Sequence, residues 1–169
     1  IKFNKSLTSL DITGSPIDDD GLGLIGDALL QEFCSVSMRF LRCFAFDVQD
    51  GASELVLNGE VLGVGATQLL CGVFKYNNLI KKLNLGGRGI QTTAASLLAI
   101  SVKHNTTLTS IDLSANPMSD VSQYTGKEAS DTNGLLALAE AVKGSSSLQW
   151  ITLDGSKLPV DSLKGEDGH

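Results

Sequence analysis

A repeated apolar pattern constrains this chain more than any other feature. Five short segments carry apolar residues at positions 1, 4 and 6. This alternation is typical of a strand whose apolar residues enter a core while positions 3 and 5 face outward. The pattern predicts strands near residues 7–12, 41–46, 80–85, 108–113 and 148–153.

A second pattern, with helical spacing, follows four of these strands. Its clearest copy runs from Ala94 to Val102 and ends before Asn105, and the other copies begin at Gly21, Gly65 and Gly134. The small and apolar residues of each copy form one stripe of an amphipathic helix, and the small ones allow a neighbouring helix to approach closely. Each unit is therefore a strand followed by a helix.

The spacing of the two patterns defines the repeat length. The interval from strand start to helix start is the same in the first unit, Leu7 to Gly21, and in the third, Ile80 to Ala94. An equal interval separates the helix start from the next strand start in the third and fourth units, as from Ala94 to Leu108. The unit is therefore about 28 residues long, a length typical of repeat proteins. Such repeats stack on their neighbours because a single unit cannot bury its own apolar face.

The clearest unit contains segment 104–108, His-Asn-Thr-Thr-Leu, and segment 108–118, Leu-Thr-Ser-Ile-Asp-Leu-Ser-Ala-Asn-Pro-Met. With these two segments, the unit resembles the ribonuclease-inhibitor class of leucine-rich repeats. The resemblance implies an α/β solenoid in one domain, residues 1–169, with about five repeats. In such a horseshoe arc, parallel strands line the concave face and helices cover the convex face. Asn116 occupies the family's turn position, where Ser15, Arg88 and Ser156 stand in other units.

Both ends of the sequence suggest a fragment of a longer chain. Segment 1–7 aligns without gaps on segment 102–108, which places Ile1 in the last turn of a preceding helix. A solenoid end needs a polar capping unit, and none is recognisable before Leu7. After the fifth strand, segment 158–163 is either a worn-down final repeat or the start of another unit that is cut short.

Two insertions interrupt the period. The interval from strand start to helix start extends from Leu41 to Gly65 in the second unit and from Leu108 to Gly134 in the fourth. Both intervals are longer than those of the first and third units. The additional residues are about 47–59 in the second unit and about 119–133 in the fourth.

The two insertions are expected at the same rim. The first is predicted to fold as a hairpin and the second as a polar loop. We expect their bases to lie roughly 10 Å apart, because they are two repeats apart along the sheet. They either form part of a binding surface, with Asp50, Tyr124 and Lys127 as contacts, or reflect neutral variation in loop length.

The outward strand positions define a candidate binding face. The pattern places Ser9, Cys43, Lys82, Ser110 and Trp150 at position 3, and Asp11, Ala45, Asn84, Asp112 and Thr152 at position 5. The residues selected as partner contacts are Arg42, Lys82, Asn84, Asp112, Trp150 and Thr152. Trp150 either binds a partner or lies against a further repeat, since aromatic side chains serve both purposes. A basic cluster of Arg42, Lys81, Lys82 and Arg88 either meets an anion or remains solvated.

Composition and motifs exclude several function classes. A net charge of -6 disfavours nucleic acid and anionic lipid, and the chain lacks an apolar run long enough to span a membrane. Residues 18–20, three aspartates, are interpreted as a helix cap and not as metal ligands. The glycine-rich segment 86–89 lacks the lysine of a phosphate-binding loop, and neither histidine has a catalytic partner at a recognised spacing. We expect no metal, no cofactor and no enzymatic activity.

The positions of the cysteines and of the glycosylation sequons indicate in which cellular compartment the protein is expected. Cys34, Cys43 and Cys71 are odd in number and unpaired in spacing, which favours reduced thiols in a cytoplasmic protein. Asn4 and Asn105 lie in glycosylation sequons, yet they occupy equivalent places before a strand. The repeat therefore explains both asparagines without a glycan.

These observations predict a non-catalytic protein–protein interaction module, a scaffold or sensor part of a larger intracellular protein. The partner is another protein, with no role for nucleic acid, membrane or a small-molecule substrate. An alternative is an activator of a small GTPase, a use that the repeat family supports. An arm of a ubiquitin ligase is a third interpretation, and it depends on domains outside this segment.

Overall fold

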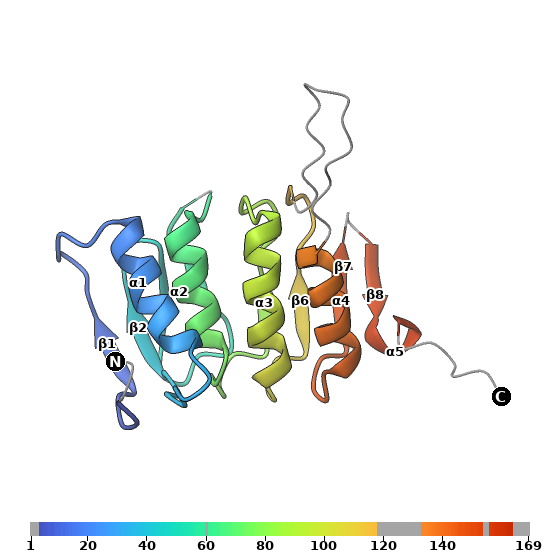
Figure 1. Ribbon diagram of the computed structural model, residues 1–169, viewed down its shortest axis with the longest axis horizontal. Helices are drawn as coiled ribbons and strands as arrows, with labels where there is room; N and C mark the ends of the chain where they lie inside the picture. Colours follow the sequence, from blue (N-terminus) through green and yellow to red (C-terminus); the bar gives the residue numbers. More distant parts are fainter. Residues whose placement is uncertain (1–3, 60, 118–132, 154–155, 164–169) are drawn as a thin grey trace, which may run out of the picture.

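The computed structural model describes residues 4–59, 61–117, 133–153 and 156–163. Its elements form two layers, with the long helices on one side of the strands (Figure 1). The strands are β1 (Ser9–Asp11), β2 (Phe40–Arg42), β3 (Phe46–Val48), β4 (Val56–Leu57), β5 (Lys82–Asn84), β6 (Ser110–Asp112), β7 (Trp150–Leu153) and β8 (Ser156–Pro159). The helices are α1 (Asp19–Leu30), α2 (Val64–Phe74), α3 (Thr92–His104), α4 (Asn133–Gly144) and α5 (Val160–Leu163).

Parallel pairing brings the repeated strands into register. β5, β6 and β7 pair in parallel, with Leu83 opposite Ile111 and Ile111 opposite Ile151. All three residues are at most 3% exposed, so position 4 of each unit enters the core as the pattern predicts. β1, β5, β6 and β7 all lie within the predicted strand segments. The four long helices also begin close to the predicted starts.

The predicted second strand, residues 41–46, is wrong in register. β2 pairs with β1 so that Leu41 lies opposite Leu10, at position 4 and not position 1. The apolar triplet is therefore Met38, Leu41 and Cys43, all at most 1% exposed, whereas Phe44 is 56% exposed. The apolar pattern places the start of this strand at Leu41, three residues too late, because Phe44 is more strongly apolar than the buried Cys43.

The first insertion lies inside the sheet and not at its rim. β3 runs antiparallel between β2 and β4, and its Phe46 and Val48 are fully buried. β3 and β4 form the hairpin predicted for residues 47–59. Glu54, just before β4, forms an isolated parallel bridge with Lys82 of β5, and this bridge connects the hairpin to β5. The predicted position at the rim is wrong because the apolar side chains of β3, Phe46 and Val48, enter the core and draw the hairpin into the sheet.

The segment that continues the repeat period is therefore 54–57, which includes the Glu54 bridge and β4. Leu55 and Leu57 precede Leu83 and Leu85 by one full repeat, and Asn77 precedes Asn105 by the same interval. β2 is in register with β1, and segment 54–57 keeps the interval to β5, so the chain between α1 and α2 contributes β2, β3 and β4, whereas the chain between α2 and α3 contributes β5 alone. The second insertion, about 119–133, lies almost wholly outside the described residues.

Buried asparagine side chains tie the segments that lead into β5 and β6 to the unit before each of them. The Asn105 Oδ1 accepts hydrogen bonds from the backbone N–H groups of Thr107 and Leu108, at 2.8 and 2.7 Å. Its Nδ2 donates to the backbone oxygens of Phe74 and Asn77, at 2.7 and 2.9 Å. Since Asn105 is 4% exposed, water cannot replace these contacts.

The same arrangement recurs at Asn77. Its Oδ1 accepts from the backbone of Leu79 and Ile80, and its Nδ2 donates to the Met38 oxygen at 2.8 Å. Asn4 also accepts from the backbone just before β1, through the Leu7 N–H at 2.6 Å. The asparagine before a strand is therefore a structural residue of the repeat.

Reciprocal capping joins α1 to α2 at both ends. Asp18 caps its own helix, as predicted for the three aspartates, by accepting from the Gly21 N–H at 2.9 Å. Asp19 instead caps the neighbouring helix and accepts from the N–H groups of Gly65 and Ala66, each at 2.8 Å. At the opposite end, the buried Lys75 donates to two backbone oxygens at the end of α1. Each charge meets the helix end that its sign favours.

The chain after β7 turns back on itself. β8 runs antiparallel to β7, with Trp150 opposite Pro159 and Ile151 opposite Leu158. Val160 of α5 is fully buried. The neighbour of Trp150 on this side is therefore an antiparallel strand and not the parallel strand of a further repeat. None of the described helices is both long and apolar enough to span a bilayer.

Replacing Asn105 with alanine should lower the free energy of unfolding by about 3 kcal/mol, because it leaves several buried backbone groups without partners. Urea denaturation of the two proteins measures this difference. The matched control is Asn78→Ala, an exposed position, which should stay within about 0.5 kcal/mol of the parent chain. Equal effects at the two positions would contradict the structural role of Asn105.

Gly65→Ala should destabilise the chain by about 2 kcal/mol, since an added Cβ would lie 1.7 Å from the Asp19 backbone oxygen. Gly144→Ala serves as the control because no atom lies within 4 Å of its added Cβ. Thermal unfolding of both variants makes the comparison. A Gly65→Ala midpoint at or above that of Gly144→Ala would show that α1 and α2 do not require this close approach.

Candidate protein-binding face

The outward positions of β5, β6 and β7 form one continuous face. Register places Lys82, Ser110 and Trp150 in one row. Asn84, Asp112 and Thr152 form a second row beside it. A hollow of about 510 Å³ lies over these rows, and Thr109 and Gln149 also line it. The predicted contacts on these three strands are therefore brought together.

Side-chain size and charge shape this hollow. Ser110 is small and stands between Lys82 on one side and Trp150, which is 38% exposed, on the other. The Asp112 Oδ1 accepts from the backbone N–H and the hydroxyl of Ser114, at 2.9 and 2.7 Å. These bonds hold the carboxylate in one orientation. A cation, an anion and an aromatic ring thus surround a space that a partner's side chain can enter.

Lys82 and Asp112 carry the opposite charges on this part of the face. Neither Lys82 nor Asp112 forms an ion pair with any residue that the structure describes. The Asn84 Oδ1 accepts from the Gly86 N–H at 3.0 Å, which fixes its amide at the strand end. Pre-oriented polar groups lose little freedom on binding, so they favour recognition of a specific partner.

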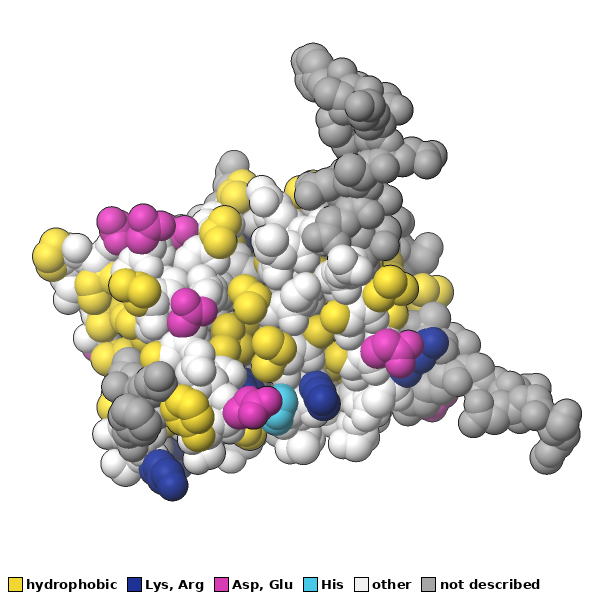
Figure 2. All heavy atoms as spheres, in the orientation of Figure 1, with side chains coloured by type: hydrophobic (Ala, Val, Ile, Leu, Met, Phe, Trp, Pro, Cys, Tyr) yellow, Lys and Arg dark blue, Asp and Glu magenta, His cyan; other side chains and the backbone are white. Residues whose placement is uncertain are grey.

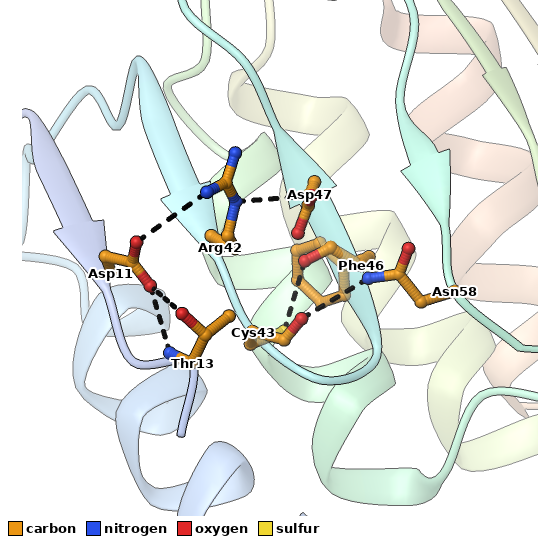
Figure 3. Close-up of polar contacts among 7 residues, drawn as sticks. All are labelled: Asp11, Thr13, Arg42, Cys43, Phe46, Asp47 and Asn58. Carbon is orange, nitrogen blue, oxygen red and sulfur yellow. Dashed lines mark hydrogen bonds and ion pairs between the residues drawn. The ribbon is translucent and has the colours of Figure 1, made fainter. Parts of the chain in front are cut away.

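Arg42 faces outward as predicted, but its charge is already neutralised locally (Figure 3). Its Nη1 lies 4.0 Å from an oxygen of Asp11, and its Nε lies 3.4 Å from an oxygen of Asp47. Its guanidinium also lies over the Phe40 ring, 5.4 Å from the centroid. β3 and β4 lie on the side of β2 that faces β5, so Arg42 is separated from Lys82 and does not belong to the predicted basic cluster.

The corrected register changes the outward residues of β2. Cys43 and Ala45, predicted at positions 3 and 5, are buried, and Phe40 and Arg42 occupy those places. Sequence reasoning therefore missed Phe40. The apolar spacing of Met38, Leu41 and Cys43 at positions 1, 4 and 6 would have indicated the correct register and placed Phe40 outward. Thr109 and Gln149 were also missed, because position 2 of a strand gives no pattern of its own.

The predicted contacts on the insertions have different outcomes. Asp50 is paired with Arg39, whose Nη2 lies 2.9 Å from the carboxylate, and both side chains are more than half exposed. An exposed pair of this kind contributes little stability. Tyr124 and Lys127 lie outside the described residues.

Metal and thiol chemistry do not define a site in the described part of the chain. No group of three or more potential ligands is present among the residues that the structure describes. Cys34, Cys43 and Cys71 are buried free thiols. Burial raises the pKa of Cys71 to about 12, so its reactive thiolate form is scarce at neutral pH.

Comparison with known proteins agrees with the repeat. The family model described as "Leucine Rich repeat" matches residues 3–26 and 104–122. "NACHT, LRR and PYD domains-containing protein 5" of Bos taurus is 31% identical over 128 residues, covering 68% of this chain. The chain belongs to the leucine-rich repeat family. Similar relatives include "Leucine-rich repeat-containing protein 73" of Homo sapiens, 29% identical over 71% of this chain.

This leucine-rich repeat chain spans a small part of its relatives. It covers 12% of the bovine protein and 34% of the human one. Among solved structures, "Leiomodin-1 Actin-Binding Site 2 (ABS2)" aligns with a TM-score of 0.43 and 16% identity. That alignment covers 89% of this chain and 72% of the other.

Thr13→Val should move the pKa of Asp11 back toward its ordinary value. Hydrogen bonds from the hydroxyl and then the backbone of Thr13 lower the pKa of this carboxyl, and the variant removes the first. Because the pKa is lowered in the folded state, the linked stabilisation exists above the unfolded pKa and disappears as pH falls through the folded pKa. An NMR titration of the Asp11 carboxyl carbon measures the change.

The control for this titration is Thr93→Val, an exposed substitution on α3. It should leave the Asp11 titration where it is in the parent chain. A Thr13→Val curve that overlays the parent curve would refute the assigned cause of the shift.

Proposed function

We propose that this chain is a non-catalytic protein–protein interaction module that binds its partner through the outward face of β5–β7. The observation that carries the proposal is the hollow lined by Lys82, Asp112 and Trp150, three different chemistries on one rigid sheet. Strand positions support precise recognition because their backbone is fixed by pairing with neighbouring strands. The leucine-rich repeat relatives agree with a role in protein interaction.

The finer architecture and compartment belong to the same proposal. Parallel strands on one side and wider helices on the other favour a solenoid arc of the ribonuclease-inhibitor class, with the β5–β7 face on its concave side. Three buried free thiols favour a reducing, cytoplasmic environment. Asn105 supports this, because its buried amide is committed to hydrogen bonds that a glycan would break.

Activation of a small GTPase is a narrower version of the same interaction. Within the described residues, the β5–β7 face contains no group that specifically favours that partner over another protein. The proposal therefore rests on binding alone, with the partner defined by its contact with this face.

Reversing both charges of the face tests the proposed function. The Lys82→Glu/Asp112→Lys variant keeps the net charge and should lose at least tenfold in affinity for a partner captured from the source cell. The matched control, Lys103→Glu/Glu140→Lys, makes the same exchange on α3 and α4. Calorimetric titration with the purified partner compares the three proteins.

The two variants alter side chains that face outward, so both should retain the parent circular dichroism spectrum and a cooperative unfolding transition. Selective loss of binding in the β5–β7 variant is the expected result. Loss in the α3–α4 variant alone, or undiminished binding by the β5–β7 variant, would show that the partner contacts another surface.

A further inference from the structure

The helical side carries apolar side chains that no described element covers. Leu24 of α1 is 73% exposed, Val64 of α2 is 63% exposed, and Val61 just before α2 is 68% exposed. Figure 2 shows hydrophobic side chains gathered over α1, α2 and α3, with acidic side chains beside α1. An apolar group of this kind on a charged surface marks an interaction site more often than scattered single residues do.

Two hollows meet on this surface. One, of about 440 Å³, lies between α2 and α3, and Val61, Val64 and Leu97 line it. The other, of about 260 Å³, lies between α1 and α2, and Leu24 and Val64 line it. Because Val64 belongs to both, the hollows form one surface across three helices, which we call the α1–α3 surface.

Unequal helix packing opens the larger hollow. Glycines bring α1 and α2 into backbone contact along their length, as the Gly65 approach to Asp19 shows. α2 and α3 instead meet near their C-terminal ends, where the Ser101 hydroxyl donates to the Cys71 oxygen at 2.5 Å. The hollow lies between their N-terminal halves, where Val64 and Thr67 of α2 and Leu97 of α3 line it. A groove between two helices fits the apolar ridge of a third.

The charges of the α1–α3 surface have one sign. Asp20 and Asp27 line the smaller hollow, and no lysine or arginine lines either one among the residues that the structure describes. Neither carboxylate forms an ion pair with a described residue, although Asp27 accepts a hydrogen bond from Gln68. The whole chain has a net charge of -6, so a second copy would bring further negative charge to this surface.

We propose that the α1–α3 surface docks a basic amphipathic helix of another protein. Its apolar side chains occupy the two hollows, and its lysine or arginine side chains face Asp20 and Asp27. This mode uses anchors on successive turns of the helix and complementary charge at its edge. The site lies on the helical layer and is independent of the β5–β7 face.

A designed peptide tests this site without knowledge of the natural partner. The probe is a fluorescein-labelled helix of about five turns, with leucines on one face and lysines along its edges. Fluorescence anisotropy measures its binding, and a second peptide carries glutamate in place of every lysine. We expect saturable binding of the lysine peptide that weakens with salt, and at least tenfold weaker binding of the glutamate peptide.

Two pairs of variants locate the binding. Leu24→Ser/Val64→Ser should lower the affinity for the lysine peptide at least tenfold. Leu136→Ser, on the exposed face of α4, should leave this affinity within twofold of the parent value. Asp20→Asn/Asp27→Asn should lower it about fivefold. The charge control, Glu54→Gln/Glu140→Gln, should have less than a twofold effect. All of these side chains are exposed, and unfolding midpoints verify that each variant folds.

Three results would overturn the proposal. They are equal binding of the two peptides, equal weakening by the site and control variants, and absence of saturable binding in the millimolar range. Sedimentation of the chain alone provides a further test. A dimer that is lost in the Leu24→Ser/Val64→Ser variant would identify a second copy as the occupant instead.

Discussion

The buried asparagines Asn77 and Asn105, which precede β5 and β6, make the contacts on which the stacking of these repeats depends. Asn77 and Asn105 each accept from two backbone N–H groups just before a strand and donate to a backbone oxygen of the preceding unit. One side chain therefore sets where a strand begins and how it attaches to its neighbour. The reciprocal caps of Asp19 and Lys75 perform the same task between α1 and α2. Once strand starts are fixed, the alternation along each strand determines which residues face outward.

The sequence predicts the repeat, its helices and most of its strands because their apolar spacing is regular. It misplaces the second unit because two segments compete for the role of its strand. Residues 41–46 contain more strongly apolar side chains, whereas residues 54–57 keep the repeat interval to β5. In the folded chain both segments pair with a neighbouring repeat, since β2 pairs with β1 and Glu54 bridges to Lys82. Local hydrophobicity alone cannot reveal that a hairpin will be inserted within a sheet.

In the candidate site, too, regular spacing predicts some residues and tertiary packing decides the others. Positions Lys82, Asn84, Asp112, Trp150 and Thr152 are predicted correctly as one outward face because their strands keep the period. Arg42 is placed outward, yet its neighbours Asp11 and Asp47 come from strands whose proximity requires the corrected register. The hollows of the helical layer depend on how closely each pair of helices approaches, which is a property of glycine contacts between units. Residue spacing in the sequence indicates which side chains face outward, whereas the packing of helices against one another determines where hollows form between them.

Two surfaces with different chemistry thus arise from one repeat. The β5–β7 face combines both charges with an aromatic ring, whereas the α1–α3 surface is apolar with acidic edges. Site-specific photo-crosslinking to the captured partner tests the role of the β5–β7 face most directly. A benzophenone side chain introduced at Ser110 should form a covalent adduct with that partner, and one introduced at Ala137 on α4 should not. An adduct from Ala137 together with none from Ser110 would contradict binding through the sheet.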